Sequence, residues 1–145
     1  MDADGASPNC CGSGLACVFA QALLARAAAC PLAVRSAQAE RTLVECSAPV
    51  SHVNCQTLAA LLFERSRFAL RLPPAGRPLM HQQALRLQCG GVAAIAQALG
   101  GDCNDVHGLV GQAQTRHGSL TELPWASLVA AVVAWQPPRR RPARP

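Results

Sequence analysis

Hydrophobic residues recur three and four positions apart over most of the chain, which is the spacing that places them on one face of a helix. The clearest case follows Asn54, a good N-cap, where Leu58, Leu61 and Leu62 would share a face. The same spacing predicts helices over residues 14–29, 79–88, 92–99, 106–116 and 124–135. The last of these stretches is apolar nearly all round, so we expect it to be buried or docked on a partner.

Prolines and glycines divide these stretches. Pro31 should end the first helix, residues 47–54 with their central proline read as a loop, and Cys-Gly-Gly at 89–91 should break a helix. Short strands are predicted at 42–45 and 67–72. The pattern therefore predicts a mainly α fold, a small domain of about five helices with at most one short β-hairpin.

The length of 145 residues suits one domain. We expect a flexible, cysteine-containing lead-in at 1–13, a single helical domain over 14–136 and a disordered tail rich in proline and arginine at 137–145. Half of the residues are hydrophobic and 14% are charged, which excludes a wholly disordered chain. No apolar run reaches the roughly 18 residues that a membrane span needs.

The formal net charge of +5 is concentrated in the tail. Four of the thirteen cations are Arg139, Arg140, Arg141 and Arg144, and without them the chain is close to neutral. The tail could contact an acidic surface, although a solubilising role is the simpler interpretation. Nucleic-acid binding is disfavoured, because the segment most similar to a helix-turn-helix, residues 83–99, has almost no side chains that could read bases.

The first charges of the chain are Asp2 and Asp4, whereas a secretory signal begins with cations. We therefore expect a cytoplasmic protein, in a compartment that keeps thiols reduced. Every cation is arginine and none is lysine, which is typical of a GC-rich bacterial genome. In the cytoplasm, cysteines are better explained by metal binding or burial than by disulfides.

The eight cysteines fall into two groups of four along the chain. The first group comprises Cys10, Cys11, Cys17 and Cys30, and the second comprises Cys46, Cys55, Cys89 and Cys103. No two cysteines are separated by exactly two residues, which weakens the case for zinc and for thioredoxin-like chemistry. Iron–sulfur clusters tolerate wider spacing, so we expect one or two clusters, of the 4Fe–4S type, with zinc as the alternative.

The second group is the preferred ligand set. Cys46 and Cys55 flank a stretch that contains Pro49 and His52, and His52 could ligate the metal or hydrogen-bond to a sulfur, although a surface histidine is the simpler interpretation. Cys17 and Cys30 would face different directions if they stood on one helix. Ordinary buried thiols remain an alternative for any of the eight.

These features predict a small iron–sulfur protein that acts in electron transfer, or as an accessory factor in metallocluster metabolism, with a redox or metallocluster protein as its partner. We expect a carrier or accessory protein rather than an enzyme. The first alternative is a metal-free helical interaction module that uses its last helix or its arginine tail. The second is a thiol enzyme with Cys55 as nucleophile and His52 or His81 as base.

Five arginines lie close together in the sequence around the proline-rich turn. They are Arg65, Arg67, Arg71, Arg77 and Arg86. A solvated surface is the simpler interpretation, and a docking face for an acidic partner is the alternative if the fold brings several of them together.

Overall fold

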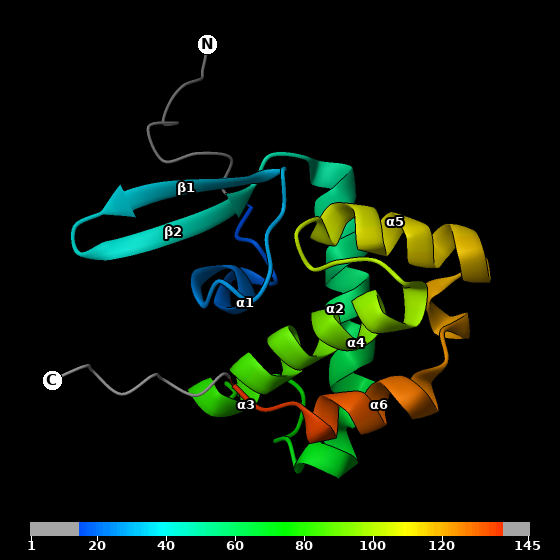
Figure 1. Ribbon diagram of the computed structural model, residues 1–145. Coiled ribbons are helices and arrows are strands. Elements are labelled where there is room, and N and C mark those ends of the chain that lie inside the picture. The colour runs from blue at the N-terminus through cyan, green and yellow to red at the C-terminus, as the bar shows by residue number, and fades with distance from the viewer. Residues whose placement is uncertain (1–14, 138–145) are drawn as a thin grey trace, which may run out of the picture.

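The computed structural model describes residues 15–137, and it confirms a mainly α fold with one β-hairpin (Figure 1). The elements are α1 (Ala20–Leu24), β1 (Ala33–Gln38), β2 (Arg41–Cys46), α2 (Pro49–Leu70), α3 (His81–Leu85), the π-helical turn η1 (Arg86–Gly90), α4 (Gly91–Leu99), α5 (Val106–His117), the 3₁₀ turn η2 (Leu120–Glu122) and α6 (Trp125–Ala134). The predicted lead-in and nearly all of the predicted tail lie outside the described residues.

The long helix α2 is the centre of the fold, and α4, α5 and α6 pack against it or against one another (Figure 1). Its 22 residues correspond to a length of about 33 Å. Leu58 and Leu62, each 1% exposed, lie on its buried face, as the hydrophobic spacing predicted. The apolar helix α6 is also buried as expected, through Trp125, Leu128 and Val132.

Two predictions about α2 were wrong. The segment 47–54 is mostly helix rather than loop, because Pro49 occupies the first turn, where a missing N–H costs nothing. The segment 67–72 is the end of the same helix rather than a strand. The helix stops at Arg71, which adopts a left-handed conformation with φ 54°.

The predicted break at residues 89–91 was also wrong, because α3, η1 and α4 form one continuous helical run. The two glycines permit close packing instead of ending the helix. A Cβ atom on Gly91 would lie 2.7 Å from Cδ1 of Leu62, and one on Gly90 would lie 3.1 Å from Cβ of Trp135. Gly90 lets the end of the π-helical turn approach the chain after α6, and Gly91 lets the start of α4 approach α2.

The N-terminal part of the described chain is less helical than predicted. Of the stretch 14–29 only Ala20–Leu24 forms an α-helix, and the chain turns at Arg26, which has a φ of 60°. The strand predicted at 42–45 is confirmed as part of β2. Its partner β1 was not predicted, because β1 is largely exposed and has no apolar alternation. The two strands pair antiparallel, from Ala33 opposite Cys46 to Gln38 opposite Arg41.

No helix within residues 15–137 is both long enough and apolar enough to cross a membrane.

Ser66 is a buried polar residue of α2, with 0% exposure, and its hydroxyl has no hydrogen-bond partner in the described structure. Replacing Ser66 by alanine should therefore raise the free energy of unfolding by about 1 kcal/mol, since it removes an unsatisfied group and adds helix propensity. Urea denaturation measures this change. Ser51→Ala is the matched control, because Ser51 Oγ is hydrogen-bonded to His107 Nδ1 at 2.9 Å. Loss of this hydrogen bond should lower the free energy of unfolding. A destabilised Ser66→Ala variant would contradict the prediction.

Gln88, in the π-helical turn, caps α1 from a distance. Its Oε1 accepts hydrogen bonds from the backbone N–H groups of Gln21 at 2.9 Å and Ala22 at 3.2 Å. These N–H groups belong to the first turn of α1, which has no local side-chain cap. Replacing Gln88 by alanine should lower the free energy of unfolding by about 1 kcal/mol.

Gln97→Ala, at an exposed position of α4, is the control for Gln88→Ala and should change stability by less than about 0.5 kcal/mol. Thermal and urea unfolding measure both variants. Equal stability of the two variants would show that the cap contributes nothing.

Candidate functional site

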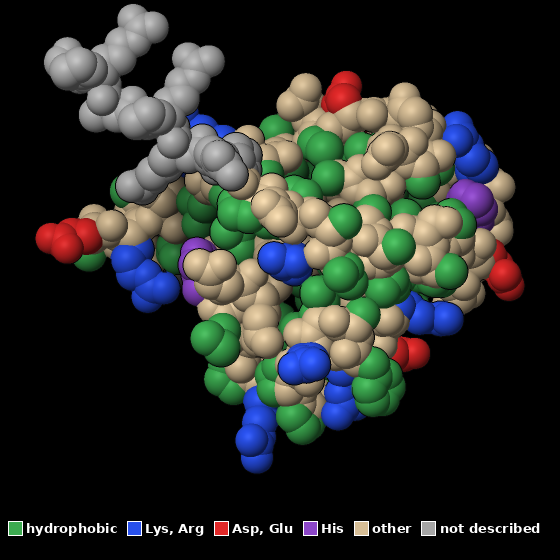
Figure 2. All heavy atoms as spheres, turned by 60° about the horizontal axis from the view of Figure 1, so that its bottom comes forward, with side chains coloured by type: hydrophobic (Ala, Val, Ile, Leu, Met, Phe, Trp, Pro, Cys, Tyr) green, Lys and Arg blue, Asp and Glu red, His purple; other side chains and the backbone are tan. Residues whose placement is uncertain are grey.

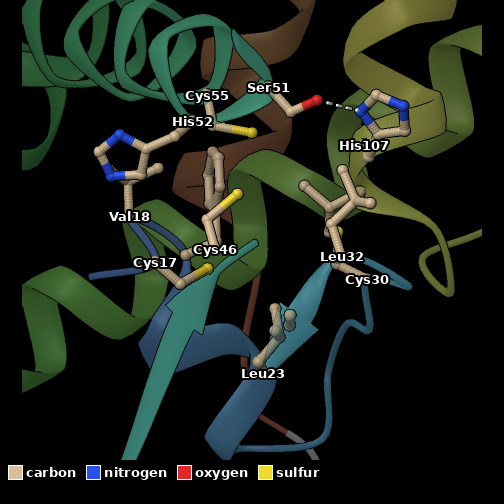
Figure 3. Close-up of a pocket in the computed structure, with 13 residues that line it drawn as sticks. Cys17, Val18, Leu23, Cys30, Leu32, Cys46, Ser51, His52, Cys55 and His107 are labelled. Atoms are coloured by element: carbon tan, nitrogen blue, oxygen red, sulfur yellow. Dashed lines mark hydrogen bonds between the residues drawn. The ribbon is translucent and has the colours of Figure 1, made fainter. Parts of the chain in front are cut away.

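Four cysteines from four separate segments line one small pocket (Figure 3). Cys17 precedes α1, Cys30 lies in the loop between α1 and β1, Cys46 ends β2, and Cys55 stands in the second turn of α2. We call this feature the cysteine pocket. In Figure 3 the thiols of Cys17, Cys46 and Cys55 follow one another along one side of it.

Backbone hydrogen bonds bring these segments together. The N–H of Cys17 donates to the carbonyl of Val44 at 2.9 Å, and the N–H of Cys46 donates to the carbonyl of Leu15 at 2.8 Å. The segment around residue 16 therefore runs beside β2, on the edge opposite β1. On the other side, Ser47 donates from its N–H and its hydroxyl to the carbonyl of Leu32, at 2.9 and 2.8 Å, which holds the Cys30 loop close to the end of β2.

The first turns of α2 supply the remaining polar groups. Ser51, His52 and Cys55 are three and four positions apart on the helix, so they share a face that borders the pocket. Ser51 is hydrogen-bonded to His107 on α5. His52 donates from Nε2 to the carbonyl of Ala16 at 2.9 Å, and its other ring nitrogen, Nδ1, takes no part in this bond. Sequence reasoning missed Ser51, because it placed residue 51 in a loop. His107 is an exposed residue of α5, and no signal in the sequence connects it with Ser51.

The cysteine pocket is narrow and uncharged. Its cavity volume is about 20 Å³, and apolar side chains such as Phe19, Leu23 and Val106 complete its wall. Asp, Glu, Lys and Arg are absent from the described residues that line it. Within residues 15–137, no three or more His, Cys, Asp or Glu side chains form a ready-made site for a metal ion. The four thiols therefore line the same pocket, but their sulfur atoms are not arranged around a single metal position.

Burial controls the acidity of these thiols. The pKa of Cys55 is raised to about 12, mainly by desolvation on burial and to a smaller extent by the neighbouring thiols of Cys17, Cys30 and Cys46. The pKa of Cys17 is also raised, first by burial, although a backbone hydrogen bond at Phe19 opposes the shift. Both thiols are therefore protonated at neutral pH. A metal that binds them must displace protons.

The structure groups the cysteines differently from their order along the chain. Cys46 and Cys55 meet Cys17 and Cys30 rather than Cys89 and Cys103. Cys89, in η1, is 2% exposed and belongs to the hydrophobic core of the domain, and Cys103 lies in the loop between α4 and α5. Burial raises the pKa of Cys89 most, with a smaller contribution from Cys103. Burial also raises the pKa of Cys103, followed by the charge of Asp102.

Cys10 and Cys11 of the first predicted group lie outside the described residues. No disulfide joins any two of the six cysteines within residues 15–137.

The two histidines considered as bases for Cys55 have different positions. His52 borders the cysteine pocket, whereas His81 begins α3. Helix α3 lies at the far end of α2, where Gln83 Nε2 donates to the carbonyl of Arg71 at 3.5 Å. Arg71 is 16 positions from Cys55, or about 24 Å along the helix. His81 is therefore remote from Cys55.

No family model, no curated protein and no solved structure matches this chain.

Proposed function

We propose that the protein binds a thiolate-ligated metal centre in the cysteine pocket, through Cys17, Cys30, Cys46 and Cys55. The observation that carries this proposal is the convergence of four thiols from four segments on one pocket. Thiolates are the ligands preferred by iron–sulfur clusters, zinc and monovalent copper. The chain thus supplies the four sulfur ligands that such a centre requires.

The surroundings of the pocket also fit a metal centre. The N-terminal end of α2 borders the pocket, and the partial positive charge of a helix N-terminus stabilises thiolates. His52 has one ring nitrogen bonded to a backbone carbonyl, which is the arrangement that orients metal-binding histidines. We therefore assign His52 to a position beside the ligands, where its bond to the carbonyl of Ala16 holds the Cys17 segment against the start of α2.

An iron–sulfur cluster of the 4Fe–4S type is the occupant that we propose first, because its ligands come from distant loops as they do here. A cluster bound there would supply one-electron chemistry. The protein would then act as an electron carrier or as an accessory factor in metallocluster metabolism, with a redox or metallocluster protein as partner. The reducing cytoplasm is the compartment in which such thiols stay free.

A single zinc ion is the second candidate, and the cavity volume favours it. A cavity of about 20 Å³ has room for one small ion or water, whereas a cluster would require the pocket wall to move outward. The Cys17 segment and the Cys30 loop are the parts of the wall outside the helices and strands. Moving the Cys17 segment outward would break the bond between His52 of α2 and the carbonyl of Ala16, so a cluster requires more rearrangement than a single ion.

The other two alternatives have less support. A thiol enzyme needs a nucleophile whose pKa is near or below neutral, and burial moves Cys55 in the opposite direction. An interaction module that binds a partner through the last helix would need the apolar face of α6 to be exposed, but α6 packs that face inside the domain.

Anaerobic purification followed by iron, sulfide and zinc analysis tests the proposal. We expect visible absorption from a cluster and equal amounts of iron and acid-labile sulfide. One zinc per chain, without colour, would support the second candidate. A protein that contains no metal after anaerobic purification, cannot be reconstituted with iron and sulfide, and does not bind zinc would contradict both.

A further inference from the structure

Four arginines surround the C-terminal end of α2, in a part of the molecule remote from the cysteine pocket. Arg67 lies in the last turn of α2, Arg71 caps it, Arg77 belongs to the turn before α3, and Arg86 begins η1. Together with the exposed Phe68 and Met80 they form what we call the arginine surface. Figure 2 brings the lower side of Figure 1 forward and shows arginine side chains projecting among hydrophobic ones on this face.

Two of these arginines share a cleft. Arg71 and Arg86 line a hollow of about 280 Å³ together with Gln82 and Gln83, and Leu70 and Val133 contribute apolar side chains to it. Arg86 Nη1 donates to the carbonyl of Val133 at 2.7 Å, so this guanidinium is fixed in place and keeps further N–H groups for a ligand.

The frame around the cleft is held by Gln83. Its Oε1 accepts from the N–H of Met80 at 3.3 Å, and its Nε2 donates to the carbonyl of Arg71 at 3.5 Å. These two bonds connect the end of α2, the proline-rich turn and α3. The cleft itself is lined by the end of α2, by α3 and η1, and by Val133 of α6, and the Gln83 bonds connect two of these elements, α2 and α3.

The positive charge of this surface is largely unneutralised. Within residues 15–137 the guanidinium groups of Arg71 and Arg77 form no hydrogen bond or ion pair with another described side chain. One acid, Glu64, lies beside Arg67 in an adjoining hollow. Free guanidinium groups bind carboxylates with two parallel hydrogen bonds, and the surface is complementary to an acidic ligand.

Two large apolar side chains stand beside these charges. Phe68 is 89% exposed and Met80 is 70% exposed, and the Arg67 guanidinium lies 5.9 Å from the centre of the Phe68 ring. Aromatic residues, methionine and arginine are the residue types enriched in protein–protein interfaces. A partner that covers this surface would bury apolar area and neutralise charge together.

We infer that the arginine surface is the docking site for an acidic segment of a protein partner, one that carries apolar side chains between its carboxylates. A protein fits better than a single-stranded nucleic acid, which needs several aromatic rings for successive bases. Here one aromatic ring is exposed on the arginine surface, and Leu70, Met80 and Val133 offer aliphatic contacts suited to apolar side chains. This inference does not depend on whether the cysteine pocket binds a metal.

The test uses the full chain and three fluorescent probes. One is a short peptide in which glutamate pairs alternate with leucine or phenylalanine, the second has glutamine in place of glutamate, and the third is single-stranded DNA of equal charge. Fluorescence anisotropy at low salt measures affinity, and amide and arginine side-chain NMR signals locate the bound probe. We expect the acidic peptide to bind and to shift the signals of Arg71 and Arg86.

Matched double variants decide the result. Arg71→Ala with Arg77→Ala removes two free guanidinium groups and should weaken peptide binding by about tenfold. Arg26→Ala with Arg41→Ala removes the same charge from exposed positions on the α1 side and in the hairpin, and should leave affinity nearly unchanged. Phe68→Ser should also weaken binding, and its exposure makes it harmless to folding.

Several results would overturn the inference. Equal binding of the glutamine peptide would show that charge does not matter. Tighter binding of the DNA, with the same dependence on Arg71 and Arg77, would identify a nucleic-acid surface instead. Absence of binding by the acidic peptide, or an equal loss in both double variants, would show that these arginines are ordinary solvated side chains.

Discussion

Replacing Cys55 by serine is expected to remove most of the metal from the protein. Serine keeps nearly the same shape but cannot supply a thiolate, so the pocket loses one of its four ligands. We expect the iron content per chain after anaerobic reconstitution to fall by about tenfold or more, with loss of visible absorption. Cys17→Ser and Cys46→Ser should have the same effect.

Cys103→Ser is the matched control for Cys55→Ser. Cys103 is half-buried like Cys55, but it does not line the cysteine pocket. The variant should keep the iron content of the unmodified protein. This comparison distinguishes two ligand sets. The set formed by the fold contains Cys55 but not Cys103, whereas the set suggested by chain order contains both. Equal loss of iron in both variants would contradict the assignment of the ligands.

Metal retention is expected to depend steeply on pH. Burial raises the pKa of Cys17 and raises that of Cys55 to about 12, so both thiols carry protons in the metal-free protein at neutral pH. Binding a metal releases these protons, and acid therefore favours the metal-free form. With at least two protons released, the apparent affinity should fall by roughly hundredfold for each pH unit of acidification.

Iron transfer to a chelator under anaerobic conditions measures this dependence. The reconstituted protein is incubated at several values between about pH 6 and pH 8.5, the range in which both thiols would be protonated without metal. Retention should fall as the pH is lowered, with a slope of two protons or more. A retention curve that is flat over this range would show that the buried thiols are not ligands.

The sequence predicted the buried face of α2 correctly, because Leu58 and Leu62 are large, apolar and regularly spaced. It failed where one residue type has two structural uses. Proline can end a helix or begin one, and Pro49 begins α2. Glycine can break a helix or allow close packing, and Gly91 allows the approach of Leu62. The choice between these uses depends on neighbours that are distant in the sequence.

The sequence predicted that the candidate site consists of cysteines, but it did not predict which cysteines come together. Cys46 and Cys55 were recognised together, since one short segment holds both. Their meeting with Cys17 depends on the bonds between the segment around residue 16 and β2, and that pairing left no signal in the hydrophobic pattern. The role of Ser51 would have followed if Pro49 had been placed in the first turn of a helix, because Ser51 and Cys55 are then one turn apart.

The length of α2 has a consequence for how the molecule could work with others. This one helix borders the cysteine pocket at its first turns and carries the arginine surface at its last, with about 24 Å between Cys55 and Arg71. A protein held at the arginine surface would leave the opposite end uncovered. Two different molecules could then occupy the two ends at the same time, with α2 as a rigid spacer that keeps a delivered or received metal centre at a constant distance from the tethered partner.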